Sequence, residues 1–188
     1  CIHMGPAVVM RGRKEANDYY RLLLRELNDR VENVAGALPD ERHRFYWDGM
    51  PIWGKLRKMS DIFSRLKSCV VVSSYCNSWV FSAFDPKDPF RSMAEAYCSI
   101  FISQDDNFKE NYIADKVDRF SIDGIVYHEA KSCANNTNSR YGMPDRLRNR
   151  LGIPYLVIDG DLNDLRCYSE EQTTTNIEAF VEQIEESI

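Results

Sequence analysis

The chain has 188 residues, and its 24 lysines and arginines against 29 aspartates and glutamates give a formal net charge of −5. A content of 44% hydrophobic and 12% aromatic residues is enough for a substantial core, which excludes intrinsic disorder as the main description. The acidic balance excludes a nucleic-acid groove, and no apolar run approaches the roughly 20 residues that cross a bilayer. We therefore expect a cytoplasmic protein that has neither nucleic acid nor a membrane as its partner.

The predicted elements alternate between helices and short apolar strands. Residues 13–34 carry apolar side chains at steps of three and four, which predicts an amphipathic helix that Gly36 and Pro39 end. Apolar runs predict strands over residues 44–47, 69–73, 124–127 and 155–158. Further helices are predicted over residues 51–67, 90–102, 108–120 and 145–151, and a last helix follows the capping box of residues 169–172.

Strands that alternate with helices indicate an α/β protein. We expect a Rossmann- or flavodoxin-like domain of three layers with a parallel sheet of about four strands, preceded by the amphipathic helix. Residues 1–38 would then form an amino-terminal helical segment and residues 39–188 the α/β domain. In a strand order of 2-1-3-4, the order reverses between the first and third strands. This reversal brings Asp48 and Gly49 beside the loop that holds Cys133.

Two loops that follow strands hold the candidate site. Residues 128–138 are polar with Cys133 in the middle, and a thiolate there is a metal or cluster ligand, a nucleophile, or a loop cysteine without a role. Residues 74–79 mix hydroxyl, amide and thiol groups with large rings, which suits a substrate pocket or packing against neighbouring helices. The candidate substrate-binding residues are Trp47, Asp48, Ser74, Tyr75, Asn77 and Trp79.

The six cysteines lie at positions 1, 69, 76, 98, 133 and 167 without a CxxC pair. This spacing excludes a self-contained zinc knuckle, and the length of the chain argues against a disulfide framework. Cys69 and Cys98 fall in a predicted strand and a predicted helix, where we expect them to be small hydrophobic residues of the core. The patterns assign no role to Cys76 or Cys167.

Five segments carry a resemblance that extends over essentially the whole chain: MRGRKEANDYYRLLLRELNDRV, FYWDGMPIWG, SSYCNSW, DGIVYHEAKSCANNTNSRYG and LGIPYLVIDGDLNDLRCYSEEQTTTNIEAFVEQIE. Together they resemble the 2-hydroxyacyl-CoA dehydratase family, which also includes benzoyl-CoA reductase subunits. The last segment is the most specific of the five. The resemblance is to the carboxyl-terminal part of a subunit about twice as long, which would also explain why the chain begins with cysteine.

The resemblance implies an oxygen-sensitive lyase of anaerobic amino-acid fermentation that works as a heterodimer of two subunits. Each subunit of such an enzyme holds an iron–sulfur cluster, usually [4Fe–4S], and a separate ATP-dependent activator protein injects one electron. The acyl-CoA substrate becomes a ketyl radical anion, and water is lost from an (R)-2-hydroxyacyl-CoA to give an (E)-2-enoyl-CoA.

By the same resemblance, Cys133 is the carboxyl-terminal ligand of the [4Fe–4S] cluster, and the other ligands lie outside this chain. One thiolate cannot hold a four-iron cluster, so we expect the isolated chain to carry no cluster and no activity. A benzoyl-CoA reductase-type subunit is the alternative within the family. A non-catalytic α/β interaction module is the alternative outside it, with Cys133 incidental and the aromatic loops forming a protein interface.

Overall fold

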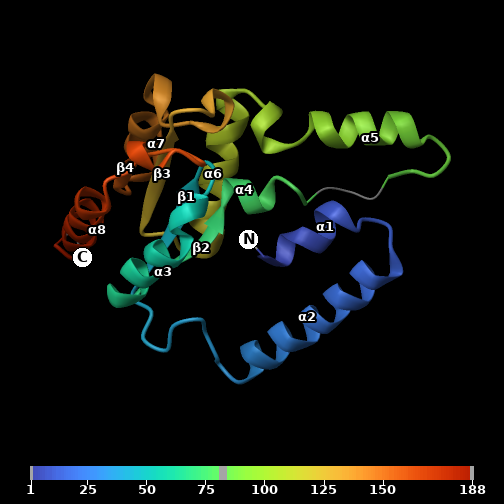
Figure 1. Ribbon diagram of the computed structural model, residues 1–188, viewed down its shortest axis with the longest axis horizontal. Helices are drawn as coiled ribbons and strands as arrows, with labels where there is room; N and C mark the ends of the chain where they lie inside the picture. Colours follow the sequence, from blue (N-terminus) through green and yellow to red (C-terminus); the bar gives the residue numbers. More distant parts are fainter. Residues whose placement is uncertain (1, 81–83, 187–188) are drawn as a thin grey trace.

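The computed structural model describes residues 2–80 and 84–186 (Figure 1). Its strands are β1 (His43–Asp48), β2 (Ser68–Ser73), β3 (Gly124–Ala130) and β4 (Tyr155–Gly160). Its α-helices are α1 (Gly5–Val9), α2 (Lys14–Glu32), α3 (Leu56–Arg65), α4 (Ser74–Asn77), α5 (Pro89–Cys98), α6 (Asp106–Phe120), α7 (Met143–Leu151) and α8 (Glu170–Glu185). Short 3-10 helices are η1 (Ile2–Met4), η2 (Trp53–Lys55), η3 (Phe101–Ser103), η4 (Ala134–Asn136), η5 (Arg140–Gly142) and η6 (Leu165–Cys167). None of the helices described is long and apolar enough to span a membrane.

The four strands form one parallel sheet in the order β2-β1-β3-β4. The predicted α/β class is therefore confirmed, and the strand order is the one for which Asp48 and Gly49 are expected beside the Cys133 loop. Register along β1 is regular against β3, where Trp47 pairs with Val126, and it shifts between Phe45 and Tyr46 against β2. The order reverses between β1 and β3, so the carboxyl ends of these two strands lie side by side. In open α/β sheets, ligands bind beside the carboxyl ends of the strands at such a reversal.

Helices cover both faces of the sheet, and side chains of β1 point alternately into two cores. Phe45 and Trp47 pack with α3 and α8, where Phe63 and Phe180 are buried beside them. Tyr46 packs into the second core, which α6 and α7 close. This alternation is the period-two pattern of a strand buried on both faces, and it gives the three-layer arrangement that the sequence predicts.

Two helical segments extend away from the layered domain, α2 and α5 (Figure 1). The apolar stripe of α2 is exposed at Leu24, Leu27 and Val31. Ala16 is the buried residue of this helix among those described. The amphipathic helix is thus where the sequence predicts it, whereas the division of the chain at residue 38 stays a prediction.

Several local predictions differ from the structure. The helix predicted over residues 51–67 begins only at Leu56, and the helix predicted over residues 90–102 ends at Cys98. Strand β2 lies at an edge of the sheet, so Val70 is 41% exposed instead of covered on both faces. Helix α6 begins earlier than predicted, at Asp106, because the side chain of Asp105 accepts the Phe108 amide at its amino terminus. Strand β3 continues to Ala130, because its last residues still pair with β4.

Cys69 and Cys98, the two cysteines predicted to lie in the core, differ in burial. Cys98 is exposed at the end of α5, so its predicted burial is wrong. Cys69 is half-buried on the edge strand β2, and burial raises the pKa of its thiol to about 11. Burial fails at Cys98 because the helix that carries it extends away from the sheet (Figure 1).

Candidate functional site

The site begins where β1 ends, at a glycine that no other residue can replace without displacement of its neighbours. Gly49 has φ +93°, and a Cβ atom built on it would lie 3.0 Å from the His128 carbonyl oxygen and 3.1 Å from that of Asn136. Its amide donates a hydrogen bond of 2.9 Å to Ser74 Oγ at the start of α4. The ends of β1, β2 and β3 therefore meet at Gly49, as the reversed strand order predicts.

A buried chain of three polar side chains lies beside Gly49. Asp48, Asn138 and Lys109 are 1%, 7% and 7% exposed. Asn138 Nδ2 donates to Asp48 Oδ2 at 2.9 Å, and Lys109 Nζ from α6 donates to Asn138 Oδ1 at 3.1 Å. Burial raises the pKa of Asp48 to about 6, although the hydrogen bond from Asn138 opposes the shift.

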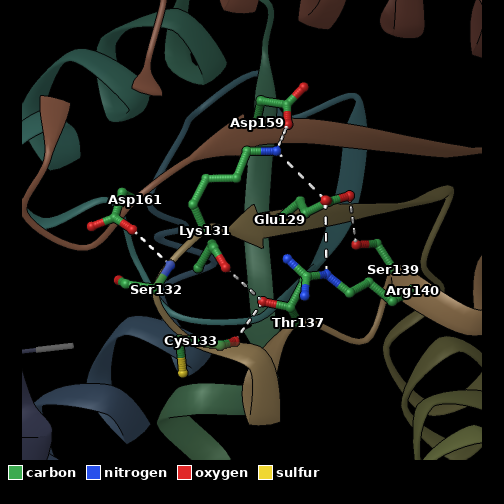
Figure 2. A network of polar contacts seen from close by, with 10 residues as sticks. Glu129, Lys131, Ser132, Cys133, Thr137, Ser139, Arg140, Asp159 and Asp161 are labelled. Atoms are coloured by element: carbon green, nitrogen blue, oxygen red, sulfur yellow. Dashed lines mark hydrogen bonds and ion pairs between the residues drawn. The ribbon is translucent and has the colours of Figure 1, made fainter. Parts of the chain in front are cut away.

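Cys133 lies half-buried in the loop that follows β3. Thr137 Oγ1 is within hydrogen-bonding distance of two carbonyl oxygens, that of Ala130 at 3.1 Å and that of Cys133 at 2.6 Å. The Ser132 amide donates to Asp161 Oδ2 at 2.8 Å, which ties the front of the loop to the chain beyond β4. In Figure 2 the sulfur of Cys133 points away from this network of polar contacts. These hydrogen bonds hold the backbone of the loop, and the thiol of Cys133 takes no part in them.

Asp161 is the acidic anchor of this loop. Hydrogen bonds from Ser132 and from the amides of Asn163 and Asp164 hold the pKa of the Asp161 carboxyl well below its usual range. The carboxylate is therefore charged throughout the neutral and mildly acidic range, and its bond to the Ser132 amide is charge-assisted.

Basic side chains around the loop are paired with acidic ones (Figure 2). Lys131 Nζ contacts the carboxylate of Asp159 and lies 3.5 Å from Glu129 Oε1, and Arg140 Nε lies 3.8 Å from the same oxygen. The hydrogen bond to Asp159 raises the pKa of Lys131. Both Lys131 and Arg140 are thus paired with carboxylates, and Asp161 adds a third acidic group beside the same loop.

Aromatic rings gather on α4 and η2. The ring centroids of Trp53 and Tyr75 lie 5.6 Å apart, those of Tyr75 and Trp79 lie 6.4 Å apart, and both pairs are edge-to-face. Arg11 donates to the carbonyl of Trp79 at 2.9 Å, which joins the amino-terminal helices to α4. The ring cluster of Trp53, Tyr75 and Trp79 therefore connects η2 with α4, and Arg11 connects it with the amino-terminal segment.

A groove of about 570 Å³ runs along β2 and α3 to the start of α4. Trp47, Cys76 and Asn77 line its end nearest the site, and apolar side chains line much of the rest. Trp47 is otherwise buried in the core, with its indole N–H donating to the Met50 carbonyl at 3.3 Å. The groove is within the usual size range of small-molecule sites.

The candidate substrate-binding residues therefore occupy different depths. Trp47 and Asn77 reach the groove, and Tyr75 and Trp79 belong to the ring cluster. Asp48 and Ser74 are 1% exposed, so neither side chain faces a ligand at the surface. Asn138 could have been found from its place in the polar loop, whereas Lys109 stands in an amphipathic helix without any pattern that marks it.

The described residues hold no group of three or more His, Cys, Asp or Glu side chains arranged to bind a metal. Cys133, with its thiol half-buried and outside the polar network of the loop, fits the role of one thiolate ligand. A four-iron cluster needs three or four such ligands. With Cys133 in that role, the further ligands would have to come from outside residues 2–80 and 84–186.

The family model described as 2-hydroxyglutaryl-CoA dehydratase, D-component, matches residues 1–184. The chain belongs to this family. The resemblance that the sequence segments carry is therefore confirmed over nearly the whole chain.

The chain is similar to three relatives, two dehydratase subunits and one reductase subunit. It is 30% identical over 193 residues to (R)-2-hydroxyglutaryl-CoA dehydratase, subunit alpha, of Acidaminococcus fermentans, covering 97% of this chain and 38% of that protein. It is 28% identical over 185 residues to (R)-2-hydroxyisocaproyl-CoA dehydratase alpha subunit of Clostridioides difficile, covering 98% and 45%. It is 24% identical over 195 residues to a benzoyl-CoA reductase subunit of Thauera aromatica, again covering 98% and 45%. The chain spans less than half the length of these relatives.

Proposed function

We propose that the chain is the carboxyl-terminal part of the alpha-type subunit of a 2-hydroxyacyl-CoA dehydratase, a hydro-lyase. The observation that carries the proposal is the family match over residues 1–184, together with a cysteine loop at the reversal point of the sheet. Relatives named as alpha subunits of dehydratases support the reaction class. Their names also support a second subunit as partner.

In the proposed reaction, the C2–OH bond and one C3–H bond of an (R)-2-hydroxyacyl-CoA break, and the C2=C3 double bond of an (E)-2-enoyl-CoA forms as water leaves. The C3 proton of such a thioester is barely acidic, so a positioned base alone is a poor catalyst for its removal. When bound, a [4Fe–4S] cluster would supply the single electron, received from an ATP-dependent activator protein, that makes this proton removable as the thioester becomes a ketyl radical anion.

Cys133 is the residue of this chain that we assign to the cluster, as one ligand among several. It follows β3 at the edge of the sheet where ligands gather in open α/β folds, and its loop is fixed by hydrogen bonds to Asp161 and Thr137. The proposal includes a cytoplasmic location for the protein.

The acyl part of the substrate is assigned to the groove that Trp47 and Asn77 line and to the ring cluster of Trp53, Tyr75 and Trp79. Apolar walls with a few polar groups orient such a ligand and exclude water from it. Rings of this size suit a branched or an aromatic acyl chain.

The test uses the longest gene product that contains these residues, purified without oxygen together with its partner subunit and activator. Cys133→Ser should lose iron and dehydration of (R)-2-hydroxyacyl-CoA, because a hydroxyl does not replace a thiolate ligand. The matched control is Cys98→Ser on the exposed end of α5, which should keep both. Cys76→Ser should also keep its iron, and full iron in Cys133→Ser would refute the assignment.

A benzoyl-CoA reductase-type subunit is the second candidate, favoured by the 24% identity to the Thauera aromatica protein. Incubation with benzoyl-CoA in place of (R)-2-hydroxyacyl-CoA separates the two, since the reductase would consume electrons in proportion to product. A dehydratase would form enoyl-CoA with electrons needed only in catalytic amounts.

A further inference from the structure

The loop that carries Cys133 has an exposed front and a buried back. Residues 131 and 132 are exposed, whereas Asn136, Thr137 and Asn138 are 4%, 4% and 7% exposed. The buried back is polar, and polar groups remain buried only where hydrogen bonds compensate for the loss of water. The hydrogen bonds of this back half therefore decide how the loop is held against the sheet.

Those bonds are of two kinds. Thr137 contacts only carbonyl oxygens of the same stretch of chain, those of Ala130 and Cys133, so it sets the shape of the loop. Asn138 instead reaches across the fold, to Asp48 at the end of β1 and to Lys109 on α6. Asn138 is thus the residue of the buried back whose side chain joins the loop to other elements.

We infer that Asp48 and Lys109, joined through Asn138, are positioning residues that hold the Cys133 loop on the sheet. The inference rests on the proposed function only in taking Cys133 as the cluster ligand. The Asn138 amide bonds a buried acid and a buried base. Its N–H₂ group donates to the Asp48 carboxylate, and its oxygen accepts from the Lys109 ammonium. Among side chains, only the amides of Asn and Gln present both an N–H₂ group and a carbonyl oxygen.

Asp48 and Lys109 have few other groups that could replace the hydrogen bonds of Asn138. Asp48 Oδ1 is buried and has no hydrogen-bond partner among the described residues, so Asn138 is the main side chain that compensates the carboxylate. Lys109 Nζ otherwise lies 5.7 Å from the ring centre of Phe101, a weak cation–π contact. A Cβ atom on Gly49 would lie 3.1 Å from the Asn136 carbonyl oxygen, so the loop rests directly on the backbone at the end of β1. Loss of Asn138 would leave two buried charges poorly compensated, and the loop would open to admit water to them.

Hydrogen exchange of the iron-free chain tests this without any cluster chemistry. The amides of Ser132, Cys133 and Asn136 are hydrogen-bonded, so their exchange reports opening of the loop, and amides of α8 serve as the internal reference. Asn138→Ala should speed exchange in the loop at least about tenfold and leave α8 unchanged. The matched control is Asn135→Ala, an exposed asparagine of the same loop, which should change neither.

Two further variants separate positioning from general support of the fold. Asp48→Asn keeps an acceptor oxygen for Asn138 and should exchange within about twofold of the parent, whereas Asp48→Ala should open the loop. If Asn138→Ala does not fold, Lys109→Met removes one of the two bonds and keeps the apolar stem, and it should speed loop exchange about threefold. Equal exchange in Asn138→Ala and Asn135→Ala would overturn the inference, and so would a rise in α8 as large as in the loop. Neither result depends on whether Cys133→Ser loses iron.

Discussion

Asp48 gives the sharpest test of how the buried side of the site is built. Its carboxyl is 1% exposed, and burial raises its pKa from 3.8 to about 6. A shift of about two pKa units corresponds to roughly 3 kcal/mol at 1.36 kcal/mol per unit. Because the folded state holds the proton more tightly, this group favours folding fully below the unfolded pKa of 3.8, and its contribution is lost as the pH rises through about 6.

Asp48→Asn removes this titration and keeps an oxygen that accepts from Asn138. The free energy of unfolding of the parent should fall by about 2 kcal/mol between about pH 4.5 and pH 7.5 relative to that of the variant. Urea unfolding followed by tryptophan fluorescence at half-unit steps of pH measures both curves. Asp61→Asn on the exposed side of α3 is the matched control for the substitution of an aspartate by asparagine. Parallel curves for Asp48→Asn and the parent would refute the reasoning.

Three further predictions concern the site. Gly49→Ala should lower the free energy of unfolding by more than about 2 kcal/mol, because its Cβ meets two carbonyl oxygens, whereas Gly12→Ala with φ +81° and open space around it should cost about 1 kcal/mol; equal losses in urea unfolding would contradict the close approach. Tyr75→Ala should raise KM for the acyl-CoA about tenfold with kcat little changed, since it removes a ring that binds and does not react, and steady-state kinetics with an unchanged KM would argue against the ring cluster as an acyl site. Anaerobic reconstitution of the 188-residue chain with iron and sulfide should give far less than four irons per chain, and a stoichiometric four-iron count would show that the chain supplies a complete ligand set.

Local patterns predict the architecture of this chain well because each strand is a short apolar run and most helices have a regular stripe. The strand order adds long-range information, since it places Asp48 and Gly49 beside the loop of Cys133 before any contact is known. The serine cap of the predicted capping box is confirmed, with the Gln172 amide donating to Ser169 Oγ at the start of α8. The reciprocal bond of the box is not formed, because the Gln172 side chain donates to Asn176. These features are governed by burial and by backbone hydrogen bonds over a few residues.

The contacts that hold the site are less accessible from sequence. Lys109 lies 29 residues before Asn138 in the chain, and only the packing of α6 on the sheet turns it toward that residue. The edge position of β2 cannot be read from its sequence, because a run of Val70, Val71 and Val72 has the composition of a central strand. Exposure of Cys98 likewise depends on where α5 extends, which composition does not encode.

The edge position of β2 has a practical consequence for handling the chain. Within residues 2–80 and 84–186, β2 pairs on one side with β1 and ends the sheet there, and its Val70 is 41% exposed. An apolar edge strand whose amides and carbonyls face outward can pair with the same edge of another molecule, which leads to aggregation during expression. Val70→Lys would place a charge on this edge outside the two buried cores, but Val70 also lines the groove assigned to the acyl group. The change therefore suits concentrated samples for structural work and not assays of acyl binding.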